Sequence, residues 1–229
     1  MISLRRIFCL LLISGTCFGQ DQKKLGKPIG VLALPKKTIE LTEAQIKERM
    51  IGKIFPTFSF YDLDSVLYSN ESLKGKVALV SIWKIGCMAC MWEIPHFNQL
   101  KKNYEGKDFS LISMSPFSKK MLTSFKGEKK EWTRMDTVFP GLRKYFHINS
   151  IDYPILPTCD NSLTPQYIDT NIVIDTYCDF LEKNFNIYTY PIVFIVDKKG
   201  IVREIFIGFD PKGQVISLFT QKIDALLKE

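Results

Sequence analysis

Two cysteines, Cys87 and Cys90, are separated by two residues and have the clearest chemical potential in the sequence. An apolar run at residues 77–83 precedes them, and a segment with helical spacing of apolar residues follows them. This pattern predicts that Cys87 lies where a buried strand turns into a helix. The first amides of a helix lack partners and stabilise a thiolate, and in such a setting the pKa of a thiol falls from ~8.5 into the range ~3.5–7.5. The pair is predicted to exchange thiols and disulfides, with Cys87 attacking and Cys90 resolving the mixed disulfide.

Three other uses of such a pair fit the sequence less well. A zinc site needs about four ligands, and the histidines His96 and His147 are not at ligand spacing, so we predict no metal site. Haem attachment requires a histidine directly after the second cysteine, where this chain has Met91. A purely structural disulfide stays open, although a loop this short removes little chain entropy.

The elements that must position the pair follow from the spacing of apolar residues. The helix after Cys87 is predicted to run to about residue 104, with a kink at Pro95. A strand, this helix and a second strand should form a right-handed parallel unit, and a turn at residues 197–200 should join the last two strands as an antiparallel hairpin. Other elements are predicted as strands at 77–83, 109–114, 191–196 and 201–207, short helices near 42–50, 142–148 and 177–185, a short strand at 153–157 and a closing helix near 215–227.

The N-terminus has the pattern of a secretory signal. Two arginines precede a short apolar core at residues 7–13, and small and polar residues follow. We expect residues 1–19 to be a signal peptide, with cleavage after Gly19. The alternative is lipid attachment at Cys17, although the residues before it are a poor version of the lipoprotein box. Both versions predict export to the periplasm or cell envelope, and this compartment is oxidising.

The remaining cysteines bear on the same question. Removing the leader leaves four of the six cysteines, an even number that suggests pairing in an oxidising compartment. With Cys87 and Cys90 as the natural first pair, Cys159 and Cys178 remain. A disulfide between these two would close a loop and stabilise the folded protein by on the order of 3 kcal/mol. The alternative is two unpaired cysteines.

The composition excludes several function classes. At 46% hydrophobic and 24% charged residues, the chain is typical of a globular protein rather than a disordered one or a multi-span membrane protein. The net charge of +7 is dispersed in short lysine pairs, without a basic helix or an aromatic-interleaved patch. We therefore expect a solvated lysine-rich surface and no nucleic-acid partner.

The residues around the pair resemble a known family. The run W-x-x-G-C-x-x-C-x-x-E-x-P from Trp83 to Pro95, with Tyr190 and Pro191 before a later apolar strand, resembles the thioredoxin-like thiol-disulfide oxidoreductases of the TlpA/ResA type. The resemblance implies an α/β thioredoxin-like fold with a central mixed β-sheet flanked by helices. It implies the following organisation: an N-terminal extension at residues 20–50 and a thioredoxin-like domain at 51–229, with an insertion at about 116–175 before the cis-proline strand.

The resemblance also implies roles. Cys87 and Cys90 match the redox pair, and Glu93 matches an acid beneath them that helps move the proton of the resolving thiol. Glu93 follows Cys90 by one helical turn, as this role requires, although a first-turn glutamate favoured by the helix dipole explains its position equally well. Thioredoxin itself has a buried acid where this chain has Ser81, so Glu93 is the remaining candidate.

A second group of residues is expected to contact substrate. Pro191 matches the family's cis-proline, and Tyr190 before it would touch the substrate. Trp83, Gly86 and Met88 complete this predicted substrate-binding set.

The sequence thus predicts an exported thioredoxin-like enzyme that acts on the disulfides of exported proteins. It should need no cofactor, because an upstream dithiol protein, expected in the membrane, would supply electrons. The alternative is a redox-inactive thioredoxin-fold module that binds, scaffolds or carries a metal.

Overall fold

The computed structural model describes residues 41–126, 135–159, 180–185, 189–208 and 214–229. All of them belong to one compact unit, Glu40–Glu229. The expected signal peptide, with Gly19 and Cys17, lies outside the described residues, as does Cys178. The compact unit takes in the end of the predicted N-terminal extension, including helix α1 (Glu43–Met50).

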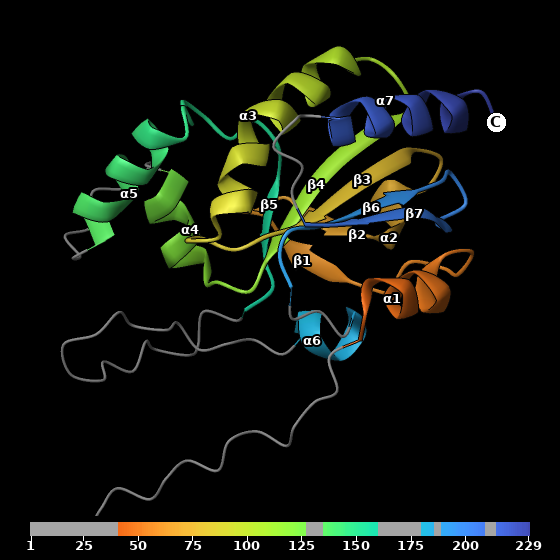
Figure 1. Ribbon diagram of the computed structural model, residues 1–229, viewed down its shortest axis with the longest axis horizontal. Coiled ribbons are helices and arrows are strands. Elements are labelled where there is room, and N and C mark those ends of the chain that lie inside the picture. The colour runs from red at the N-terminus through yellow and green to blue at the C-terminus, as the bar shows by residue number, and fades with distance from the viewer. Residues whose placement is uncertain (1–40, 127–134, 160–179, 186–188, 209–213) are drawn as a thin grey trace, which may run out of the picture. The chain divides into compact units, whose positions relative to one another are not determined.

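A five-stranded mixed sheet forms the centre of this unit (Figure 1). Its strands, in spatial order, are β5 (Ile155–Pro157), β4 (Phe109–Ser115), β3 (Val77–Ile82), β6 (Ile192–Val196) and β7 (Val202–Ile207). β3 runs parallel to β4, and β4 runs parallel to β5, whereas β6 is antiparallel to both β3 and β7. The predicted parallel unit and closing hairpin are confirmed. Every residue of β3 is buried, because helices cover both faces of the sheet.

Helices lie on both faces of the sheet. Figure 1 shows α3 (Met88–Asn103) and α7 (Gln214–Leu227) on one face, with α1 and α6 (Phe180–Phe185) on the other. Alternate residues of β3 pack into two separate hydrophobic cores. Leu79 packs with α3 and α7 on one face of the sheet, and Val80 packs with α1 and α6 on the other. This alternation follows from the period of two along a strand. A small hairpin, β1 (Ser59–Tyr61) and β2 (Leu67–Ser69), precedes the single-turn helix α2 (Asn70–Leu73).

Local sequence explains two of the helices directly. α1 begins with a capping box, in which Thr42 and Gln45 each accept a hydrogen bond from the other's backbone amide. α3 contains Pro95, as the sequence predicted, and Figure 1 shows this helix changing direction along its length. Within the described part of the chain, no helix has the length and apolarity needed to cross a membrane.

The segment after β4 contains elements that the sequence predicted only in part. Its helices are α4 (Lys119–Lys126) and α5 (Met135–Tyr145), and it ends in the edge strand β5. The helix predicted at residues 142–148 in fact begins about two turns earlier, at Met135, and ends at Tyr145. α4 was not predicted. α4 has only Leu122 and Phe125 buried, which is too little apolar spacing to recognise without the core they contact.

Candidate active site

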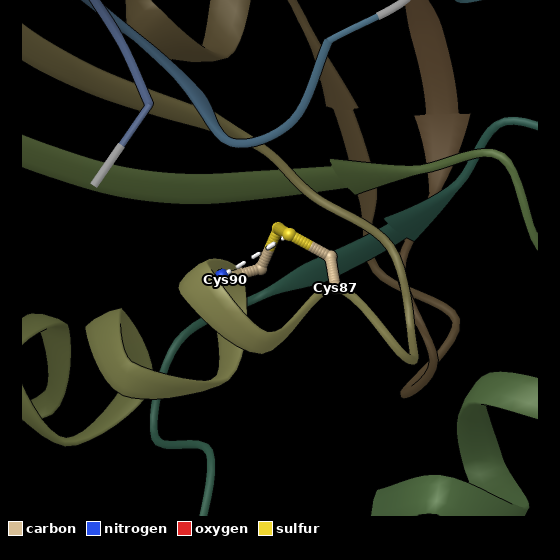
Figure 2. The surroundings of a disulfide bond; sticks show 2 residues. All are labelled: Cys87 and Cys90. Atoms are coloured by element: carbon tan, nitrogen blue, oxygen red, sulfur yellow. Dashed lines mark hydrogen bonds between the residues drawn. A yellow bond between two sulfur atoms is a disulfide. The ribbon is translucent and has the colours of Figure 1, made fainter.

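Cys87 and Cys90 are joined by a disulfide at the N-terminus of α3 (Figure 2). Cys87 is the N-cap residue of the helix, and its Sγ accepts a hydrogen bond from the backbone N–H of Cys90, with 3.2 Å between sulfur and nitrogen. Gly86 has a φ of 82°, a left-handed conformation that favours glycine and lets the chain turn from β3 into α3. The predicted strand-to-helix turn is confirmed.

The two sulfurs differ in accessibility. Cys87 is half-buried, whereas Cys90 is 1% exposed and belongs to the core between α3 and the sheet. A second protein can therefore reach Cys87 but not Cys90. Disulfide exchange requires direct contact between the attacking and attacked sulfurs, so this asymmetry agrees with the expectation that Cys87 attacks.

Glu93 is a buried carboxyl one turn further along α3. Its side chain is 4% exposed, and no hydrogen-bond partner lies near its Oε2 atom among the described residues. Burial raises the pKa of this carboxyl from 4.5 to about 8. The first turn of α3 contains no acidic residue, so the alternative that the helix dipole favours Glu93 as a first-turn glutamate does not hold.

Tyr153, just before β5, is a second buried titratable group near Glu93. Burial is the main cause that raises the pKa of Tyr153, and the charge of Glu93 raises it further. Its ring packs against Phe97 of α3, with 6.1 Å between the ring centroids. No local pattern indicates this proximity, because the two residues come from distant segments.

The peptide bond between Tyr190 and Pro191 is cis, as the resemblance implied. Ile82 of β3 pairs with Ile192 of β6, so Pro191 lies at the same end of the sheet as the chain leading to Cys87. Lys84 in that connection places its Nζ 4.9 Å from the centroid of the Tyr190 ring. The cis-proline segment and the connection before the disulfide are thus in contact.

The other predicted substrate-binding residues differ in exposure. Met88 is exposed, as a contact residue requires. Trp83 is 2% exposed and packs against Phe125 of α4, so the prediction that it touches substrate is not favoured by its burial. Ser81 is buried in β3 and supplies a hydroxyl where thioredoxin has an acid.

Cys159 follows β5 in a buried position. It is disulfide-bonded, and its partner lies outside the described residues. The pairing with Cys178 therefore stays a prediction. The described residues contain no cluster of three or more His, Cys, Asp or Glu side chains that could hold a metal ion.

Sequence reasoning missed an exposed aromatic group on α3, the helix that begins at the disulfide. Trp92, one helical turn after Met88, contacts Tyr145 at the end of α5 and the neighbouring Phe146. Trp92 is 39% exposed, so its ring is available to solvent. Its spacing of four residues from Met88 was the available signal.

Known proteins resemble the chain in sequence. The model of the AhpC/TSA family matches residues 51–205. Thioredoxin-like protein YneN of Bacillus subtilis (strain 168) is 24% identical over 188 residues, which cover 82% of this chain and 85% of that protein. Thiol-disulfide oxidoreductase ResA of Bacillus anthracis is 35% identical over 69 residues, but these cover only 30% of this chain and 40% of ResA.

Solved structures resemble it in fold. A Chlorobium tepidum protein assigned as thiol:disulfide interchange protein DsbE superposes with a TM-score of 0.52 at 16% identity, covering 77% of this chain and 97% of that one. A Bacteroides thetaiotaomicron protein assigned as a protein disulfide isomerase gives a TM-score of 0.51 at 18% identity, covering 78% and 91%. At such identities the likeness shows the fold alone.

These findings confirm the thioredoxin-like fold and the resemblance to the TlpA/ResA type. The matched family model extends from just before β1 into β7, and so contains the disulfide, Glu93 and the cis-proline. The family model matches more than half of the chain, and the chain therefore belongs to the AhpC/TSA family.

Proposed function

We propose that the protein is a thiol-disulfide oxidoreductase that acts on the disulfides of exported proteins through Cys87 and Cys90. The observation that carries this proposal is the disulfide at the start of α3, with one accessible and one buried sulfur. Relatives named as thiol-disulfide oxidoreductase and thiol:disulfide interchange protein support it.

The reaction proceeds by two exchanges. In the reduced protein, the Cys87 thiolate attacks one sulfur of a substrate disulfide, and the other substrate sulfur leaves as a thiolate. Cys90 then attacks the Cys87 sulfur of the mixed disulfide, which releases the second substrate thiolate and restores the Cys87–Cys90 disulfide. Two electrons pass to the substrate, and its two thiolates take up protons. The same steps in reverse oxidise a substrate dithiol.

The ionised form of Glu93 would accept the proton that Cys90 loses before it attacks. The pKa of about 8 for this carboxyl is close to the ~8.5 of an ordinary thiol. Proton exchange between groups of similar pKa is nearly balanced, which is favourable for a general acid–base pair. Glu93 lies one turn after Cys90, on the buried side of α3, where water cannot easily perform the same transfer.

The cis-proline segment would dock the substrate backbone next to Cys87. Tyr190 is partly buried and packs against the same core as Cys87. The carbonyl of Pro191 is already bonded to the backbone N–H of Gly208 at 2.9 Å, which fixes the segment on the sheet. Gly86 and Met88 would complete the contact surface on the other side of the sulfur. An upstream dithiol protein, expected in the membrane, would return electrons to the disulfide, and no cofactor is required.

Reduction of insulin disulfides with dithiothreitol as the electron source tests the function. Wild type should accelerate insulin precipitation, and Cys87→Ser should abolish the acceleration. Cys90→Ser should instead accumulate a mixed disulfide through Cys87, which mass spectrometry detects. Gln99→Ala, at an exposed position of the same helix, is the control. Equal rates for wild type and Cys87→Ser would favour the redox-inactive binding module.

Export is a separate part of the proposal. Expression of the full chain in a bacterial host, followed by mass spectrometry of the envelope fraction, should give a mature protein that begins at Gln20. A diacylglycerol-modified N-terminus at Cys17 would select the lipoprotein form. An uncleaved chain in the cytoplasm would contradict export.

A further inference from the structure

We propose that Met88, Trp92 and Tyr145 form a docking surface for a polypeptide segment whose cysteine is flanked by apolar and acidic residues. The inference rests on the proposed function, because the segment must present its sulfur to Cys87. We name these three residues the apolar platform.

The platform is an exposed apolar surface built from two helices. Met88 is 53% exposed, Trp92 39% and Tyr145 63%. Met88 and Trp92 are four residues apart on α3 and therefore lie on one face of the helix. Tyr145 ends α5, and 6.2 Å separates its ring centroid from that of Trp92. Met, Trp and Tyr are side-chain types that are enriched at protein interfaces.

A buried residue holds the platform in place. Phe146 is 1% exposed, and the edge of one ring meets the face of the other in its contact with Trp92, with 5.0 Å between centroids. It also contacts the ring of Tyr145 at 4.8 Å. The guanidinium of Arg143 donates a hydrogen bond to the carbonyl of Lys126, which ties α5 to the end of α4. A surface held this way loses little side-chain entropy when a partner binds.

The platform is continuous with the reactive sulfur. Met88 directly follows Cys87, and Trp92 lies one further turn along α3, which is about 5.4 Å of helix. A residue in an extended segment advances the chain by about 3.3 Å. A partner whose cysteine meets Cys87 and whose chain continues along α3 would place its next one or two side chains over Met88 and Trp92. Those are the positions at which apolar side chains are expected.

Charge around the platform favours acidic neighbours in the partner. Lys84 precedes Cys87, His96 follows Trp92 by one turn of α3, and Lys144 and His147 flank Tyr145; all are exposed or half-buried. Residues 83–104 contain a single acid, the buried Glu93, and residues 140–151 contain none. A carboxylate beside the partner's cysteine would be attracted by the ammonium groups of Lys84 and Lys144, which adds electrostatic complementarity to apolar contact.

Peptides that share one leaving group test this inference. Each peptide carries a single cysteine in a mixed disulfide with nitrothiobenzoate, flanked either by Leu and Glu or by Ser and Lys. The small compound 5,5′-dithiobis(2-nitrobenzoate) supplies a disulfide without a peptide. Wild type should show a kcat/KM about 10-fold higher for the Leu/Glu peptide than for the Ser/Lys peptide.

Variants then assign this preference to the platform. In Trp92→Ala and Tyr145→Ser, the ratio of kcat/KM for the Leu/Glu peptide to that for the small disulfide should fall by about 5- to 10-fold. Leu218→Ala removes an equally exposed apolar side chain from α7 and should leave the ratio unchanged. Tyr145→Ser remains informative if Trp92→Ala folds poorly, because Tyr145 is mostly exposed.

The remaining outcomes separate the two proposals. A wild-type protein that reduces none of the three compounds contradicts the proposed function itself. A wild-type protein that reduces both peptides equally, or platform variants with an unchanged ratio, overturns the platform alone. Sedimentation analysis covers a second copy of this chain as the occupant: a dimer that Trp92→Ala converts to a monomer, with the ratio unchanged, also overturns it.

Discussion

The two faces of α3 differ more than their common sequence segment would suggest. The inward face holds Cys90, Glu93 and Phe97, all nearly inaccessible to solvent. The outward face holds Met88, Trp92 and His96, all exposed. Cys87 lies at the helix end, where both faces meet. In the proposed function, the inward face would set the environment of the chemistry, and the outward face would set which partners can approach it.

The difference teaches that one helix can separate reactivity from selectivity. Burial changes the protonation of Glu93 without exposing it to a substrate, since the dominant cause of its raised pKa is desolvation. Trp92, in contrast, is exposed and uncharged, so it is available for contact with a partner and does not alter the protonation of the buried groups. Substitutions on the two faces should accordingly alter different measurements.

The largest expected effect comes from Glu93→Gln on stability against pH. Below about pH 4.5 the carboxyl is protonated in both states, and above it the unfolded chain releases the proton while the native protein keeps it up to about pH 8. Wild-type stability should fall across this window by on the order of 5 kcal/mol from this group, because the native state binds more protons. Glutamine does not titrate, so the variant should lose this decrease.

Urea unfolding of the disulfide form, across the same pH range, measures this effect without titration of Cys87 or Cys90. Gln99→Ala on the exposed face is the control and should follow wild type. Parallel pH profiles for Glu93→Gln and wild type would show that the carboxyl ionises in the native protein as it does in water.

Phe97→Ala should have the next largest effect. Phe97 is 1% exposed and contacts the rings of Tyr153 and Phe219. Removing it leaves a cavity, which typically costs 3–5 kcal/mol for a buried aromatic, so the midpoint of urea unfolding should fall sharply. A loss below about 1 kcal/mol would mean that the inward face of α3 is not tightly packed.

The two reduced cysteines should differ in alkylation by about 100-fold. Cys87 is accessible and lies at the helix N-terminus, which stabilises the thiolate, whereas Cys90 is buried. Iodoacetamide added below neutral pH, followed by peptide mapping, measures both rates in one sample. In denaturant the rates should become similar, and similar rates in the native protein would contradict the assigned order.

The smallest expected effect belongs to His96→Ala. His96 is exposed and adjacent in sequence to the buried Phe97, so the pair compares the two faces directly. Surface substitutions of this kind usually change stability by less than about 0.5 kcal/mol. A clearly larger loss in urea unfolding would show that the outward face also contributes to the core.

Local sequence was enough to place the reactive pair. An apolar run before Cys87 and helical spacing after it fix a strand-to-helix turn, because these signals arise within a few residues of one another. The same holds for the hairpin of β6 and β7, whose turn contains Gly200 with a φ of 82°. The cis bond at Pro191 was accessible only through family resemblance, since few proline bonds are cis.

Only the tertiary structure decided what surrounds the pair. Helical spacing put Glu93 one turn from Cys90, but its burial, and the effect of its charge on the pKa of Tyr153, depend on segments far apart in the sequence. Trp92 likewise belongs to an aromatic cluster only through its contacts with Tyr145 and Phe146, which are far from it in the sequence. A sequence determines which residues lie on one turn or one strand, because those distances are set by the backbone. It does not determine which distant side chains remove water from a carboxyl or leave a tryptophan exposed, because that depends on how the whole chain packs.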